Sequence, residues 1–302
     1  MDYNKAIQDY KQLQGHEVLQ LRAVLFDMDG VLFDSMPYHA DAWSRVMTDA
    51  GYVFSREDVY MNEGRTGADT INTASLAQFG KLATEEQIDE LCKAKCAIFD
   101  TYPPTPRMPF ALELVKKVKE CGLTPMIVTG SGTPTLLDRI QSNFPGLFAE
   151  NHIISSFNVK RGKPYPDPYL LALERGGFKA HEAIVVENAP LGVTAGVAAG
   201  LFTIAANTGP LKNEVLSQTG ANLVFQSIEA LSGEWETQFH YLEINGIHIY
   251  ARKPSRLRWF SCIYSLFTTN CPKHHDDQLS NQEYHRQQAC FRHWPRPVRL
   301  ML

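Results

Sequence analysis

Two carboxylates stand two residues apart, directly after a short apolar run, in the segment Arg22-Ala-Val-Leu-Phe-Asp-Met-Asp-Gly30. An apolar run of this length predicts a buried strand, so Asp27 ends the strand and Asp29 lies in the turn that follows. A carboxylate at a strand end can act as a nucleophile, and a second one nearby can give and take a proton. The pair therefore indicates group transfer with nucleophilic and acid–base steps.

Three further polar groups follow other apolar runs or precede a helix. They are Thr129-Gly-Ser-Gly132, Gly162-Lys-Pro164 and Glu187-Asn-Ala-Pro-Leu-Gly192. Each motif alone is common in turns and loops, but in this order they bring a hydroxyl, a cation and more oxygen ligands to successive strand ends. Phosphoryl transfer needs such a set, because an anionic nucleophile must attack while positive charge offsets the phosphoryl oxygens.

Each catalytic side chain then has a distinct predicted task. Asp27 would form an aspartyl-phosphate, and Asp29 would protonate the leaving oxygen and later deprotonate water. Lys163 would orient Asp27 and neutralise the phosphoryl group. The Thr129 hydroxyl and nearby backbone N–H groups would bind a phosphoryl oxygen.

Apolar runs alternate with helical patterns from residue 22 to residue 225. The predicted parallel strands span residues 22–27, 125–129, 153–155, 183–187, 202–205 and 222–225. Helical spacing occurs between them, as in Ala111, Leu114, Val115 and Val118. This alternation predicts an α/β fold with a doubly wound, Rossmann-like parallel sheet and helices on both faces.

A long and almost wholly helical insert, residues 35–107, separates the first two predicted strands. Helix starts are predicted at Ser55 and Thr84, each followed three residues later by the partner of a capping box. Because the insert leaves and rejoins beside one strand end, we expect it to cap the carboxyl edge of the sheet. The predicted division is an N-terminal extension (1–20), a core (21–34 and 108–235), the helical cap (35–107) and a C-terminal appendage (236–302).

Composition and charge predict a soluble, cytoplasmic protein. The chain has 302 residues, of which 44% are hydrophobic and 21% charged, and it contains no apolar run long enough for a transmembrane helix. The first twenty residues lack the apolar segment of a secretory signal, and the six cysteines form no dense framework. A net charge of -4 argues against nucleic acid as a partner. We therefore expect neither nucleic acid nor membrane among the partners, and the oligomeric state stays open.

The last fifth of the chain differs from the rest. Residues 241–302 contain nine Lys/Arg and four Asp/Glu, a net charge of +5, which leaves -9 for residues 1–240. No sustained helical or strand period runs through this segment, so we predict a poorly ordered appendage. A zinc knuckle is the less favoured alternative, on the spacing of Cys271, His274, Cys290 and His293.

Taken together, the motifs resemble those of the haloacid dehalogenase (HAD) superfamily. The similarity covers roughly residues 21–235 and is to the branch with a helical cap, which includes β-phosphoglucomutases and small-molecule phosphatases. It rests on Phe26-Asp-Met-Asp-Gly-Val-Leu-Phe-Asp-Ser-Met-Pro-Tyr-His39, Glu63-Gly-Arg-Thr-Gly67, Thr129-Gly-Ser-Gly132 and Glu187-Asn-Ala-Pro-Leu-Gly192. Within the superfamily these motifs look most like those of Bacteroides-type inorganic pyrophosphatases. The resemblance implies a Mg²⁺-dependent hydrolase.

The predicted metal site departs from the pattern of this superfamily at one position. Most members have an Asp after Glu187, whereas this chain has Asn188, whose amide oxygen can bind Mg²⁺ but brings no charge. We expect Glu63 of the cap to restore that charge; the alternatives are weakened metal binding and a solvated Glu63. Glu187 is expected either to bind the ion or to hold a residue that does. The predicted metal ligands are Asp27, Asp29 through its carbonyl, Glu63, Glu187 and Asn188.

Further contacts with the substrate are predicted from both core and cap. Arg65 could clamp an anionic leaving group. Lys95 either extends to solvent, the favoured interpretation, or reaches toward the cleft. His39 is expected to be a hydrogen-bonded hinge residue. The predicted substrate-binding residues are Arg65, Thr129, Gly130, Ser131 and Lys163.

The sequence thus favours a Mg²⁺-dependent phosphohydrolase that hydrolyses pyrophosphate. In mutases of this branch, basic residues hold a distal sugar phosphate, and the segment Glu63–Gly67 replaces that pattern here. A β-phosphoglucomutase-like mutase or a sugar-phosphate phosphatase is the enzymatic alternative. A non-catalytic regulator that binds a phosphorylated metabolite is supported by Asn188 alone.

Overall fold

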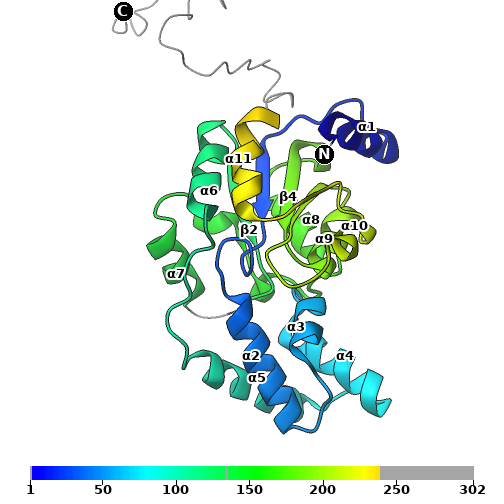
Figure 1. The fold of residues 1–302 in the computed structure, drawn as a ribbon, viewed down its shortest axis with the longest axis vertical. Helices are drawn as coiled ribbons and strands as arrows, with labels where there is room; N and C mark the ends of the chain where they lie inside the picture. Colours follow the sequence, from blue (N-terminus) through cyan, green and yellow to red (C-terminus); the bar gives the residue numbers. More distant parts are fainter. Residues whose placement is uncertain (1, 133–134, 239–302) are drawn as a thin grey trace, which may run out of the picture. The chain divides into compact units, whose positions relative to one another are not determined.

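A six-stranded parallel sheet forms the centre of the computed structural model, which describes residues 2–132 and 135–238 (Figure 1). The strands are β1 (Ala23–Phe26), β2 (Thr124–Val128), β3 (Ile153–Ile154), β4 (Ala183–Glu187), β5 (Phe202–Ala206) and β6 (Leu223–Phe225). Their order is β3-β2-β1-β4-β5-β6, and every neighbouring pair is parallel. This confirms the predicted doubly wound α/β fold, with strand ends that differ from the predicted ones by at most one residue.

Helices cover both faces of this sheet (Figure 1). On one side lie α6 (Ala111–Glu120), α7 (Leu136–Asn143) and α11 (Ile228–Gln238). On the other lie α8 (Asp167–Gly176), α9 (Pro190–Ala198) and α10 (Asn213–Gln218). Short 3₁₀ turns at 150–152, 156–158 and 180–182 complete the connections.

The alternation of side chains along β1 shows why the sheet needs both layers. Val24 and Phe26 pack with α6, α7 and α11, whereas Ala23 and Leu25 pack with α8 and α9. Successive side chains of a strand point to opposite faces, so a strand that is buried on both faces reads as a continuous apolar run. The predicted apolar face of α6 is also confirmed, because Ala111, Leu114, Val115 and Val118 are its buried residues.

The N-terminal extension contains a helix that the sequence pattern did not predict, α1 (Tyr3–Gln14). Tyr10 of this helix is only 2% exposed, and its ring lies edge-on to that of Phe202, with 5.4 Å between the ring centres. The Tyr10 hydroxyl donates to the carbonyl of Gly200 at 2.8 Å. Tyr3, Ala6 and Ile7 of the same helix are partly buried against the core, so the helix packs on it along one side.

Four helices form the insert between β1 and β2: α2 (Met36–Asp49), α3 (Arg56–Met61), α4 (Gly67–Phe79) and α5 (Glu85–Phe99). Both predicted capping boxes, at Ser55 and Thr84, are present. These helices have a small core of their own, which includes Met47, Phe54 and Ile71. The last of these helices, α5, ends at Phe99, so the rest of the insert is a connector to the core. We keep residues 35–107 as the proposed cap.

The predicted appendage begins at residue 236, but α11 extends to Gln238, so the boundary lies at least three residues later than predicted. The rest of the appendage, residues 239–302, and the zinc spacing within it lie outside the described residues. Among the helices that are described, none combines the length and the apolarity of a bilayer span.

Deleting residues 241–302 is expected to leave stability and activity unchanged, because no motif and no core pattern occurs there. The comparison is between the full chain and residues 1–240, measured by thermal unfolding and by the activity proposed below. A fall in Tm of more than about 4 °C, or a loss of activity, would show that the tail belongs to the folded enzyme.

Candidate active site

The predicted site residues converge on the carboxyl ends of three neighbouring strands. Asp27 follows β1, Thr129 follows β2, and Glu187 ends β4. The strand order reverses beside β1, which is where doubly wound sheets bind ligands. A cavity of about 280 Å³ lies at this edge and has both core and cap residues in its walls. Among the predicted residues it is lined by Asp27, Asp29, Glu63, Arg65, Thr129, Gly130 and Ser131.

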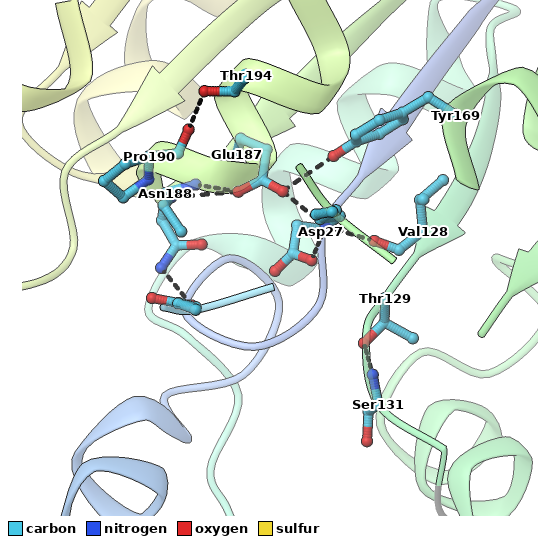
Figure 2. A network of polar contacts seen from close by, with 12 residues as sticks. Asp27, Val128, Thr129, Ser131, Tyr169, Glu187, Asn188, Pro190 and Thr194 are labelled. Atoms are coloured by element: carbon cyan, nitrogen blue, oxygen red, sulfur yellow. Dashed lines mark hydrogen bonds and ion pairs between the residues drawn. The ribbon is translucent and has the colours of Figure 1, made fainter. Parts of the chain in front are cut away.

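Lys163 is the buried centre of the polar network. Its ammonium donates to Asp27, to Glu187 Oε1 at 2.6 Å and to the carbonyl of Val128 at 3.0 Å. Figure 2 shows the Asp27 and Glu187 carboxylates turned toward the same point. Burial acts to lower the pKa of Lys163, but the two carboxylates raise it well above its usual value. The two carboxylates therefore favour the charged form of Lys163, which lies against Asp27.

Glu187 is fully engaged by donors from the core. Its Oε1 accepts from Lys163 and from the Tyr169 hydroxyl at 2.9 Å, and its Oε2 accepts from the N–H groups of Asn188 and Ala189 (Figure 2). These four donors occupy the lone pairs of both oxygens. Of the two roles that the sequence left open, this geometry fits the positioning of Lys163 and Asn188 and argues against direct metal binding.

Asp29 is held from several sides. Ser35 Oγ donates to its Oδ1 at 2.5 Å, while His39 Nε2 and Arg139 Nη2 lie 3.5 and 3.8 Å from the same oxygen. Burial acts to raise the pKa of Asp29, but these neighbours lower it below its ordinary value. These neighbours therefore favour the ionised form of Asp29, which is the form that accepts a proton. The contact with His39 goes beyond the hinge role that we predicted for that residue.

Arg139 on α7 was missed by the sequence analysis. Its guanidinium packs over the Phe33 ring, 3.9 Å from the ring centre, and this contact places it beside Asp29. Arg139 belongs to no motif and lies more than a hundred residues from Asp29 along the chain. No sequence signal available to us links the two.

Asn188 joins the core to the cap. Its Nδ2 donates to Glu63 Oε1 at 2.8 Å, and this bond fixes the orientation of the amide. Its Oδ1 is buried without a hydrogen-bond partner among residues 2–132 and 135–238. Gly30 makes room for the amide, because a Cβ at Gly30 would lie 2.1 Å from Asn188 Nδ2. Its φ of +85° also favours glycine.

The arrangement fits a hard cation. Burial, with the nearby Asp27 charge, raises the pKa of Glu63 well above its usual value. Burial also raises the pKa of Asp27, against the opposing effect of Lys163. Among the described residues, no three His, Cys, Asp or Glu side chains gather closely enough to hold a metal alone. The unpaired Oδ1 of Asn188 nevertheless lies near the carboxylates of Asp27 and Glu63, and oxygen ligands of these two kinds suit Mg²⁺.

The predicted substrate contacts are only partly as expected. Arg65 lines the cavity, and its Nε donates to Asn62 Oδ1 at 3.1 Å. The Ser131 N–H, which we expected to face a phosphoryl oxygen, donates to Thr129 Oγ1 at 3.0 Å. Lys95 also lines the cavity, so our favoured interpretation of it as a solvent-directed side chain is wrong. Its Nζ lies 4.5 Å from the centre of the Phe99 ring.

Comparison with known proteins agrees with this geometry. Residues 21–200 match the family model of haloacid dehalogenase-like hydrolases. The chain belongs to this family. The resemblance predicted from the motifs is thereby confirmed at the level of the haloacid dehalogenase-like hydrolases.

Three relatives illustrate the range of the haloacid dehalogenase-like proteins that this chain is similar to. Hexitol phosphatase A of Escherichia coli K12 is 30% identical over 217 residues, which are 71% of this chain and 94% of that protein. β-Phosphoglucomutase of Bacillus subtilis is 26% identical over 72% of this chain and 96% of its own length. A Bacteroides vulgatus protein, provisionally described as a β-phosphoglucomutase, has a solved structure with a TM-score of 0.76 and 55% identity. That similarity covers 78% of this chain and 96% of the other.

Proposed function

We propose that this protein is a Mg²⁺-dependent phosphohydrolase that passes a phosphoryl group from a small substrate to Asp27 and then to water. One observation carries the proposal. Asp27 is 5% exposed, its carboxylate is held by the buried Lys163 ammonium, and it lines a cavity that Asp29 also lines. A nucleophile, its cation and an acid–base residue then act on one enclosed substrate.

The chain's own residues divide the reaction into two displacements. In the first, an oxygen of Asp27 bonds to phosphorus while the bond to the leaving oxygen breaks, and that oxygen takes a proton that Asp29 has first taken up from solvent. In the second, Asp29 removes a proton from water, whose oxygen attacks phosphorus and releases phosphate from Asp27. Thr129 holds a phosphoryl oxygen through its hydroxyl during both displacements, while Lys163 keeps Asp27 in place and its charge offsets that of the phosphoryl group. Mg²⁺, held by Asp27 and the Asn188 oxygen, would supply further positive charge to the phosphoryl group.

Phosphorylated sugars and polyols are the first candidate substrates. They are supported by the relatives named hexitol phosphatase A and β-phosphoglucomutase. A cavity of about 280 Å³ is small among ligand sites, so it favours compact members of this class.

Pyrophosphate, which the sequence favoured, is the second candidate. It is supported by the contact of Glu63 with Asn188 at 2.8 Å, which places the cap carboxylate beside the predicted metal position. A site closed in this way offers a short substrate charged contacts on every side and leaves little room for a hexose.

A phosphate-release screen separates these candidates. The panel contains pyrophosphate, glycerol phosphate, hexitol and hexose phosphates, each with and without Mg²⁺. Release that requires Mg²⁺ supports the proposed function, and the ranking of kcat/KM identifies the substrate class. No release from any member, at any Mg²⁺ concentration, would contradict the proposal.

Glu63→Ala is expected to lower kcat/KM for pyrophosphate about a hundredfold, because it removes a charge beside the metal position. Bulkier phosphate esters should lose less, since the truncated side chain enlarges the cavity. Glu63→Gln keeps the size and the bond from Asn188 but removes the charge, so it should show a similar loss on pyrophosphate. Glu90→Ala, at an exposed position of α5, is the matched control. Equal losses on all substrates in Glu63→Ala, with full activity in Glu63→Gln, would assign Glu63 a structural role.

A further inference from the structure

The loop between α3 and α4, residues 62–66, is called the cap loop here. It meets the core at positions occupied by glycine, which has no side chain. Gly64 lies in the loop between α3 and α4, Gly130 follows β2, and Gly162 precedes α8. We call these three residues the glycine seam. A Cβ at Gly130 would lie 2.8 Å from the carbonyl oxygen of Gly64 and 3.3 Å from that of Arg65. Backbone therefore rests directly on backbone at this point.

The other two positions of the glycine seam are also tightly packed. A Cβ at Gly162 would lie 3.1 Å from Thr66 Cγ2, and one at Gly64 would lie 3.0 Å from Lys163 Cδ. Gly64 also has a φ of +93°, a backbone angle that residues other than glycine rarely adopt. Gly130 and Gly162 have no such backbone requirement, so close approach of the cap loop is what accounts for glycine there.

This close approach controls what the cap loop brings to the cavity. The same loop carries Glu63 to within 2.8 Å of Asn188 and places Arg65 in the cavity wall. A carbonyl group of the main chain cannot rotate out of the way as a side chain can. A methyl group at Gly130 would therefore push the whole loop away from the core and enlarge the cavity.

We infer that Gly130 and Gly162 are specificity-determining residues, which let the cap loop close far enough to select compact leaving groups. The inference rests on the proposed phosphohydrolase function. Small substrates depend on the closed loop, because only a closed loop keeps Glu63 and Arg65 within reach of them. Larger esters contact the cap even when the loop stands further out, so they depend on it less.

The test compares Gly130→Ala and Gly162→Ala with wild type on a compact pair, pyrophosphate and glycerol phosphate, and a bulky pair, glucose 6-phosphate and p-nitrophenyl phosphate. We expect Gly130→Ala to lower kcat/KM on the compact pair by about tenfold to a hundredfold. The ratio of kcat/KM on the compact pair to that on the bulky pair should then fall at least about tenfold. Gly233→Ala, in α11 with open space at its Cβ, should leave the ratio unchanged.

A second mutation shows whether the contact itself is the cause. Thr66→Ser removes the methyl group that a Cβ at Gly162 would meet but keeps the hydroxyl that caps α4 by accepting from the Asp69 N–H. The double variant Gly162→Ala/Thr66→Ser should therefore recover most of the ratio lost in Gly162→Ala. This pair also covers the case in which Gly130→Ala does not fold, since its clash is with a single methyl group.

The outcomes separate this inference from the function on which it rests. Wild-type protein that releases phosphate from no substrate contradicts the proposed function itself. Active wild-type protein with an unchanged substrate ratio in folded Gly130→Ala and Gly162→Ala overturns the role of the glycine seam alone. If the compact-to-bulky ratio of kcat/KM falls in Gly162→Ala and does not recover in the double variant, the contact with Thr66 is not the cause of the fall.

Discussion

Asp27→Asn is expected to lower kcat for phosphate release about 10⁴-fold or more, because the amide has the size of the carboxylate but lacks its nucleophilic charge. The fold should survive, since the Asn oxygen can still accept from Lys163 and Glu187 remains as a carboxylate partner for the ammonium. Steady-state phosphate release and thermal unfolding, measured on the same preparation, separate these two effects.

Asp34→Asn is the matched control for this substitution. Asp34 lies in the same segment after β1 but is not among the residues that line the cavity, so its variant should keep normal turnover. Normal turnover in Asp27→Asn would show that another group attacks phosphorus, and the proposed covalent route would be wrong.

Asp29→Asn is expected to lower kcat by roughly 10²- to 10⁴-fold, the range by which a positioned acid–base group accelerates a reaction. The Asn side chain can still accept from Ser35, and the backbone carbonyl predicted to bind Mg²⁺ is unchanged. The rise in Tm on adding Mg²⁺ should therefore stay close to that of wild type while turnover falls.

Two results would contradict this assignment of Asp29. Full activity in Asp29→Asn would mean that the residue neither gives nor takes the proton. Loss of the Mg²⁺-dependent rise in Tm, in step with turnover, would mean that Asp29 acts on metal binding and not on proton transfer.

The sheet was predictable because its strands are buried on both faces. A strand such as β4 has only apolar residues before Glu187, so its position and its polar end stand out in the sequence. The catalytic candidates Asp27 and Thr129 follow from the same logic, since parallel strands place their carboxyl ends at one edge. Helix α1 escaped prediction because it packs through contacts with residues remote in sequence, such as those of Tyr3 with Phe225 and of Tyr10 with Phe202.

Other parts of the site depend on contacts between segments that are remote in sequence. The engagement of Glu187 by Tyr169, and the approach of Arg139 to Asp29, arise from how the core helices pack and not from any local spacing. The hypothesis that Glu63 compensates for Asn188 came from counting charges, and the 2.8 Å contact supports it without testing metal binding. The glycine seam could not be predicted, because each glycine alone reads as an ordinary loop residue.

Trapping the phosphorylated enzyme tests the central claim most directly. The protein is mixed with Mg²⁺ and the best substrate of the screen, quenched in acid within the first turnover, digested and analysed by mass spectrometry. We predict a phosphoryl group on the peptide that contains Asp27, present in wild type and absent from Asp27→Asn. An active enzyme whose Asp27 peptide is never phosphorylated, or which carries the phosphoryl group on another residue, would contradict the account.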